Sequence, residues 1–212
     1  MVRDYGCDSL RLYEMFVGPP ELDSEWDERG IDGVYRFITR FWKLAVDSIE
    51  ANVEPTKEMI KLRHQMVHTI TRRLEDFSLN TVVSGFMEFN NKFIELAKKE
   101  GGIDKETIQT FVTLLAPFAP HIGEELWERL GNTGSVFENN KWPEADEELM
   151  KDDEIQVPVQ INGKTKVVIS VPADISKDDA IAQGKEALGD KLTGNIVKEI
   201  YVPGRIINIV AK

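Results

Sequence analysis

Apolar residues in the first two thirds of the chain recur with the period of an α-helix. In the stretch 32–52, the apolar residues that share one face, at about 100° per residue, are Val34, Phe37, Ile38, Phe41 and Ala45. Further segments with this period are 57–75, 80–99, 104–115 and a short one that ends at Leu130. Because the connections between these segments are short, the pattern predicts an antiparallel helical bundle over residues 31–135.

The hydrophobic period changes after residue 153. Apolar and polar residues alternate along 155–161 and 167–171, and Asn162-Gly163 between them is the signal of a type I′ turn, so a β-hairpin is expected. Ser176 starts a capping-box pattern that predicts a helix to about residue 188. Two further strands are expected at 196–201 and 206–210. The order ββαββ predicts a small α+β domain over residues 154–212.

Two other segments lack a clear period. Residues 1–30 are helical only in their first half, which ends at Gly18-Pro19-Pro20. Residues 136–153 are rich in asparagine and acidic side chains, a composition typical of a linker. The predicted fold is therefore a mostly α helical bundle, a linker and a small α+β domain.

The distribution of charge matters more than its sum. The chain has 26 basic and 37 acidic residues and a net charge of −11. Residues 151–212 carry nine of each, so the excess of acid lies in residues 1–150, with 17 basic and 28 acidic residues. Binding to a polyanion would therefore depend on local cationic patches. No stretch is apolar enough to span a membrane, no signal peptide is evident, and the single Cys7 allows no internal disulfide.

Signatures of catalysis are missing from the sequence. It has no glycine-rich phosphate loop and no GxSxG motif. His64 and His68 are four residues apart on a predicted helix, as two metal ligands would be, but the glutamate of an HExxH motif and a third ligand are absent. We therefore expect no catalytic residue and no metal site.

Cationic residues on the first long predicted helix form a candidate binding face. Arg36, Arg40 and Lys43 follow the i, i+4, i+7 spacing, roughly opposite the apolar stripe, and no acidic residue occurs between Gly33 and Val46. Guanidinium groups offer a fork of donors to phosphate oxygens. The spacing alone is equally consistent with an ordinary solvated helix face.

The small domain carries a second set of cations. Lys164 and Lys166 follow the hairpin turn, in a stretch without acidic residues from 155 to 173, and Lys198 and Arg205 lie in the second half. Lysines two apart on a strand project from the same face. They could bind phosphate, or they could protect a sheet edge against pairing with another strand, and the pattern does not decide between these alternatives.

Several stretches resemble aminoacyl-tRNA synthetases of class I. Leu114–Trp127 (LLAPFAPHIGEELW) resembles a segment of the anticodon-binding bundle in the enzymes for leucine, valine and isoleucine. Met1–Gly18 is similar to the segment just downstream of the KMSKS loop in bacterial leucyl-tRNA synthetases, and Gly33–Leu44 (GVYRFITRFWKL) to their GVxRFLxRVWxL helix. Val157–Pro172 and Ile200–Ala211 resemble the C-terminal domain of the leucyl enzymes, and this match is the most specific to leucine.

The resemblance implies a C-terminal fragment of a bacterial leucyl-tRNA synthetase. Residues 1–30 would be the remnant that follows the KMSKS region, 31–135 the anticodon-binding bundle, and 154–212 the domain that reaches the tRNA elbow. The full enzyme would join leucine to tRNA with ATP and Mg²⁺. This piece lacks the HIGH and KMSKS motifs and the editing domain, so it is expected to be inactive alone. We expect no cofactor in it. The expected tRNA-binding residues are Arg36, Arg40, Lys43, Lys164, Lys166, Lys198 and Arg205.

The expected partner is tRNA(Leu), bound by a cytoplasmic monomer that contacts neither DNA nor a membrane. A valyl or isoleucyl relative is an alternative, which the ββαββ module disfavours. An acidic helical module that binds another protein is a second alternative. The net charge favours it, and the two acid-free basic segments oppose it.

Overall fold

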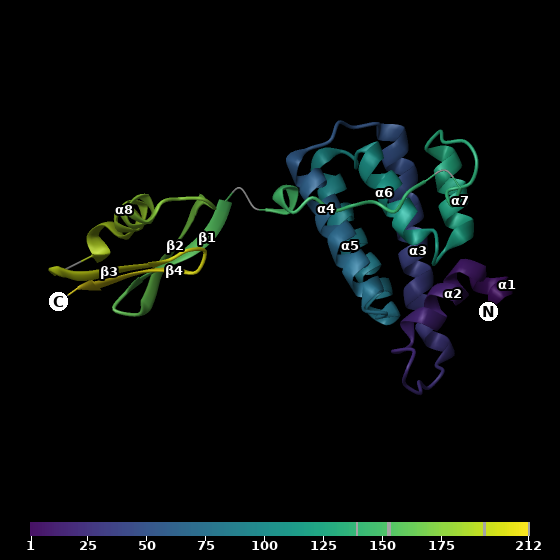
Figure 1. Ribbon diagram of the computed structural model, residues 1–212, viewed down its shortest axis with the longest axis horizontal. Helices are drawn as coiled ribbons and strands as arrows, with labels where there is room; N and C mark the ends of the chain where they lie inside the picture. Colours follow the sequence, from purple (N-terminus) through teal and green to yellow (C-terminus); the bar gives the residue numbers. More distant parts are fainter. Residues whose placement is uncertain (139, 152–153, 193, 212) are drawn as a thin grey trace. The chain divides into compact units, whose positions relative to one another are not determined.

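The computed structural model describes residues 1–138, 140–151, 154–192 and 194–211, and these form two compact units. The first unit, Met1–Met150, is helical, and the second, Lys151–Lys212, is a four-stranded sheet with one long helix (Figure 1). The predicted fold class, a helical bundle followed by a small ββαββ domain, is confirmed.

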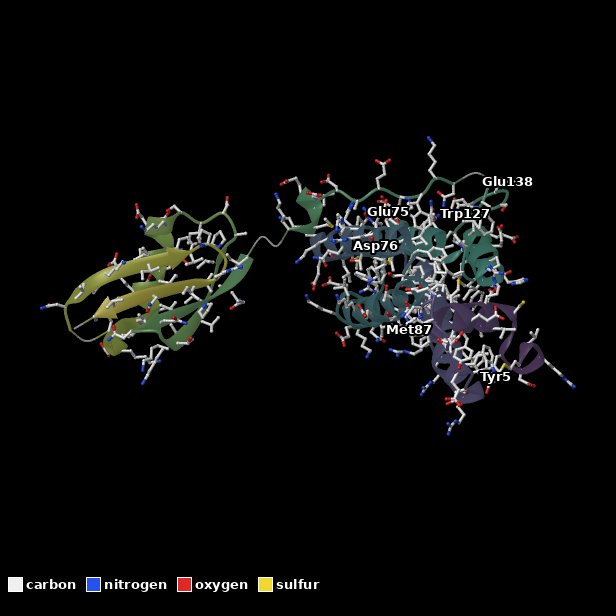
Figure 2. All side chains as sticks on the ribbon, turned by 60° about the horizontal axis from the view of Figure 1, so that its bottom comes forward. Tyr5, Glu75, Asp76, Met87, Trp127 and Glu138 are labelled. Atoms are coloured by element: carbon white, nitrogen blue, oxygen red, sulfur yellow. The ribbon has the colours of Figure 1, made fainter. Side chains whose placement is uncertain are left out.

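Among the described residues, five α-helices build the bundle of the first unit, and two α-helices precede it (Figure 1). The helices are α1 (Val2–Tyr5), α2 (Cys7–Phe16), α3 (Ile31–Ala51), α4 (Lys57–Glu75), α5 (Leu79–Glu100), α6 (Lys105–Leu115) and α7 (Pro120–Arg129). The centre of the core is aromatic, because Phe111 on α6 lies 4.3 Å from Phe41 on α3 and 5.7 Å from Phe86 on α5, measured between ring centroids. Trp127 on α7 is also buried, among the side chains of the bundle (Figure 2).

Local chemistry fixes the ends of the long helices. Thr56 and Asp104 cap α4 and α6 by accepting the N–H groups of Met59 at 3.3 Å and Thr107 at 3.0 Å. Helix α5 ends where Gly101 adopts φ +83°, a conformation that glycine reaches without steric cost. The last turn of α5 lies beside α3, where the candidate site is located.

The N-terminal segment is part of the first unit. Leu12 and Tyr13 on α2 are buried in the bundle core. The buried carboxylate of Asp8 accepts the backbone N–H of Ile122 at 2.8 Å and contacts Nδ1 of His121 at 2.7 Å. Because Ile122 is in the first turn of α7, a side chain from α2 caps the N-terminus of α7.

Residues 135–138 and 140–150, most of the predicted linker, also pack on the bundle. Val136 is buried, and Nε1 of Trp142 donates to Oγ1 of Thr71 on α4 at 2.9 Å. The contact boundary between the units accordingly falls after Met150. We call residues 135–138 and 140–150 the strap. Its few apolar and hydrogen-bonding groups find partners on helices that are distant in sequence, which its polar composition did not indicate.

The second unit is a sheet in the strand order β2-β1-β4-β3, covered on one face by α8 (Lys177–Leu188). The strands are β1 (Glu154–Ile161), β2 (Lys164–Pro172), β3 (Ile196–Val202) and β4 (Ile206–Ala211). The predicted hairpin joins β1 and β2, and the predicted turn has the positive φ angles of type I′, +50° at Asn162 and +80° at Gly163. The Asn162 side chain also exchanges two hydrogen bonds with the backbone of Ala211, at 2.9 and 3.0 Å, which ties the turn to β4.

Candidate nucleic-acid interface

Helix α3 presents its cationic residues to solvent. Phe37, Phe41 and Leu44 are buried on the inner face. The helical period therefore places Arg36 and Arg40, with Lys43, on the outside, and all three are exposed. The sequence prediction that these side chains share one face agrees with their placement.

The three cations differ in their surroundings. Arg36 donates from Nε to the backbone carbonyl of Asp32 at 3.2 Å, which leaves the rest of its guanidinium available. Within the described ranges, Arg40 has no hydrogen-bond or ion-pair partner. Lys43 forms an ion pair with Asp47 at 2.9 Å, with both side chains more than half exposed, so this pair is weak and screened by salt.

An aromatic side chain lies next to Arg36 in the sequence. Tyr35 is 43% exposed, and its ring packs edge-on against Tyr5 of α1, with centroids 5.6 Å apart. The hydroxyl of Tyr5 donates to the carboxylate of Asp32 at 2.8 Å, so the acidic residue nearest to Arg36 along the helix is already hydrogen-bonded. Exposed aromatic rings beside arginine are typical of surfaces on which RNA bases stack.

Helix α5 adds a cation that the sequence reasoning missed. A groove of 410 Å³ runs between α3 and the last turns of α5. We call it the α3–α5 groove. Its cationic rim is Arg40, Lys43 and Lys98, and its apolar floor is Leu44, Ile94 and Ala97. Lys98 comes from another helix, and only the packing of α5 against α3 brings it beside Arg40.

In the second unit, two of the expected cations lie together on the edge strand β2. Lys164 is the first residue of β2 and is paired with Ile161. Lys166 lies at a β-bulge, because the register shifts between Val159 and Gln160. Both lysines are exposed at the end of the hairpin.

The other two expected cations are not joined to this pair. Lys198 is exposed on β3, the opposite edge strand, across from Val210 on the face that α8 leaves open. Arg205 is exposed in the turn that follows the last residue of β3. Lys198 lies near the first residue of β3, so the strand separates the two cations. Lys164 pairs with Ile161 and therefore projects from the α8 face. The second unit thus offers several separate cations.

His64, weighed above only as a metal ligand, holds the strap. Its Nδ1 accepts the backbone N–H of Asp146 at 3.0 Å, which requires that nitrogen to be unprotonated. Burial, together with the nearby charge of Arg63, lowers the pKa of His64 below its ordinary value. Among the residues with described positions, no group of three or more His, Cys, Asp or Glu side chains could hold a metal ion, and none of the helices could cross a membrane.

Comparison with known proteins identifies the family. The model of the anticodon-binding domain of tRNA ligase matches residues 56–181. The chain belongs to this family. The match runs from the start of α4 into α8, and therefore includes most of the bundle and the β-hairpin of the second unit.

Similar curated proteins are leucine–tRNA ligases. Over its own whole length, this chain is 41% identical to the leucine–tRNA ligase of Fervidobacterium nodosum. Over 99% of its own length, it is 41% identical to the leucine–tRNA ligase of Parabacteroides distasonis. It spans only 28% and 22% of these relatives. Among solved structures, the agnB2 LeuRS of Agrobacterium radiobacter K84, in a ternary complex with tRNA and LeuAMS, matches 100% of this chain and 29% of its own, with 26% identity and a TM-score of 0.75.

Proposed function

We propose that this chain is the tRNA-binding part of a leucine–tRNA ligase, and that it positions tRNA(Leu) for leucylation. The observation that carries the proposal is the exposed cationic face of α3, which packs against α5, α6 and α7, helices within the range 56–181 that matches the anticodon-binding family. The relatives named above are leucine–tRNA ligases, which supports leucine over the valyl and isoleucyl alternatives. The structure of the Agrobacterium relative includes tRNA, which supports RNA over a protein partner.

The binding chemistry would be contact with the phosphate backbone. Arg36 and Arg40 are exposed and project from a rigid helix, so their guanidinium groups can meet phosphate oxygens without rearrangement of the fold. Contacts of this kind fix the orientation of a nucleic acid and do not identify its bases. Lys164 and Lys166 on the hairpin would supply a second point of attachment, and Lys43, Lys198 and Arg205 would add weaker contacts.

The chemical step would take place elsewhere in the whole protein. This chain spans about a quarter of its curated relatives, and we propose that a full-length protein of this kind joins leucine to tRNA(Leu) with ATP and Mg²⁺ as a cytoplasmic monomer. The role of the present residues is then to hold the tRNA so that its acceptor end reaches the catalytic domain. We propose no cofactor for the 212 residues themselves.

The test is a titration of the chain with a tRNA(Leu) transcript at several salt concentrations. The double variant Arg36→Ala/Arg40→Ala should bind more weakly and should lower the slope of log K against log salt by about 1.5, because each lost phosphate contact removes 0.7 to 0.9. The control is Lys105→Ala/Lys141→Ala, which removes two exposed cations from the same unit and should keep the wild-type slope. Equal slopes for all three proteins would refute the phosphate-contact proposal.

A further inference from the structure

The α3–α5 groove combines features that a phosphate-binding surface alone does not need. A row of arginines on a convex helix would suffice for backbone contacts. Here the rim cations Arg40 and Lys98 stand on two different helices, with an apolar floor between them that includes Ile94 and Ala97. The volume of 410 Å³ lies at the lower end of the range of about 300–1,000 Å³ that is usual for small-ligand sites.

We propose that the α3–α5 groove receives a single unstacked nucleotide of the bound RNA, with its base on the apolar floor and its flanking phosphates at Arg40 and Lys98. The inference rests on the proposed function and adds a base-binding subsite to it. Proteins that recognise RNA commonly bind bases that are splayed out of the stack, because only those expose a flat apolar face and free hydrogen-bonding edges. The volume of the groove suits one nucleotide.

The charges around the groove support a nucleotide as its occupant. The first unit has 11 more acidic than basic residues, yet three of the residues that line the groove are cations. Its one lining carboxylate, Asp47, is in an ion pair with Lys43, whereas Arg40 and Lys98 have no partner within the described part of the chain. The two unpaired cations are therefore the groups available to phosphate.

The end of α5 gives the groove a second kind of polarity. Gly101, the residue that ends the helix, lines the groove, and the last carbonyls of an α-helix have no N–H partner within the helix. These oxygens accept hydrogen bonds, which suits the amino and imino groups of a base and not a phosphate.

The first part of the test uses two adjacent lysines with equal charge. Lys98→Ala removes a rim cation of the groove, whereas Lys99→Ala removes a lysine that is in an ion pair with Glu58 at 3.0 Å and does not line the groove. Affinity for a tRNA(Leu) transcript, measured by fluorescence anisotropy with the full chain, should fall about fivefold for Lys98→Ala and stay within twofold of wild type for Lys99→Ala. Equal losses would contradict a specific role of the rim.

The second part fills the groove and follows the base directly. Ala97→Phe places a ring on the floor, and Thr110→Phe places the same ring on a partly exposed position of α6 that does not line the groove, as the control. Chemical probing of the bound tRNA(Leu) should find a base that the wild-type chain and Thr110→Phe protect and that becomes reactive with Ala97→Phe. If Ala97→Phe does not fold, the test uses chemical probing of tRNA(Leu) bound to Lys98→Ala and to Lys99→Ala. The base should then become reactive with Lys98→Ala and stay protected with Lys99→Ala.

The outcomes separate the two proposals. In one outcome, the wild-type chain binds tRNA(Leu) with the salt dependence given above while Ala97→Phe and Lys98→Ala give the same base reactivity and affinity as wild type. That result would refute the subsite and leave the proposed function in place. A chain without measurable, salt-dependent affinity for tRNA(Leu) would refute the proposed function first. Protection of a base only in wild type and in the two control variants supports the subsite.

Discussion

Replacing Asp8 should loosen the attachment of α2 to the start of α7. Asp8 is buried, and its two carboxylate oxygens meet three groups at the beginning of α7. These contacts are 2.8 Å to the N–H of Ile122, 3.4 Å to the N–H of His121 and 2.7 Å to the ring Nδ1 of His121. The carboxylate therefore acts as the N-cap of a helix to which it is not connected in sequence.

The cost of losing the charge follows from these contacts. A hydrogen bond to a charged group contributes about 1.5–3 kcal/mol, and a partly buried anion at a helix N-terminus interacts with the helix dipole by up to about 2 kcal/mol. Asp8→Asn keeps the shape and one acceptor oxygen, so we expect a loss of about 2 kcal/mol in the free energy of unfolding. Asp8→Ala also leaves the N–H of Ile122 without a partner, and the loss should reach about 3 kcal/mol.

Urea denaturation followed by tryptophan fluorescence measures this directly. The four tryptophans, at positions 26, 42, 127 and 142, all lie in the first unit, so the signal reports on that unit alone. Glu14→Gln is the control, because it removes one negative charge from an exposed position on the same helix. A change below about 0.5 kcal/mol in both Asp8 variants, equal to that of Glu14→Gln, would refute the capping role.

Three further predictions concern other contacts. Burial and Arg63 lower the pKa of His64, so below pH of about 6.5 the unfolded chain takes up a proton that the folded one resists. The first unit should therefore lose stability as the pH falls from 7 to 5, and His64→Asn should remove part of this dependence in fluorescence titrations. Arg63→Ala leaves the buried carboxylate of Asp104 without its ion-pair partner and should cost about 3 kcal/mol in urea denaturation, part of which Arg63→Ala/Asp104→Asn should recover. In the second unit, Asn162→Gly keeps the positive φ but loses two hydrogen bonds to Ala211, and amide exchange of β4 should speed up, less than in Asn162→Ala.

The helices and the hairpin were predictable because their signals are local. The buried face of α3 repeats every three or four residues, and the two residues of the β1–β2 turn carry the backbone preference that the turn needs. The strap was not predictable in this way. Its anchor Trp142 bonds to Thr71, which is 71 residues earlier, and no local pattern encodes such a partner.

The candidate site was predictable in part, for the same reason. Helical spacing alone places Arg36 and Arg40 on one face, but Lys98 lines a groove with Arg40 only through the packing of α5 on α3. Lys98 is one of two lysines in the last turn of α5, where a cation interacts favourably with the helix dipole. Because this local role is enough to explain a lysine at that position, nothing in the sequence indicated that Lys98 also lines a groove. The four cations of the small domain show the opposite case, because Lys164 and Lys166 lie on the edge strand β2, Lys198 lies on the opposite edge strand β3, and Arg205 lies in the turn after β3.

The acid excess of the first unit and its cationic face are compatible because salt limits the reach of both. At physiological ionic strength, exposed charges are screened over about 8 Å, so a phosphate at Arg40 responds to the rim of the groove and hardly to acids on other helices. Those acids still repel RNA that approaches any other surface. Within the first unit, a negative surface that carries a cationic face on α3 would therefore restrict a polyanion to that face, and the orientation of a tRNA bound as proposed would follow from where this unit lacks negative charge as well as from where it carries positive charge.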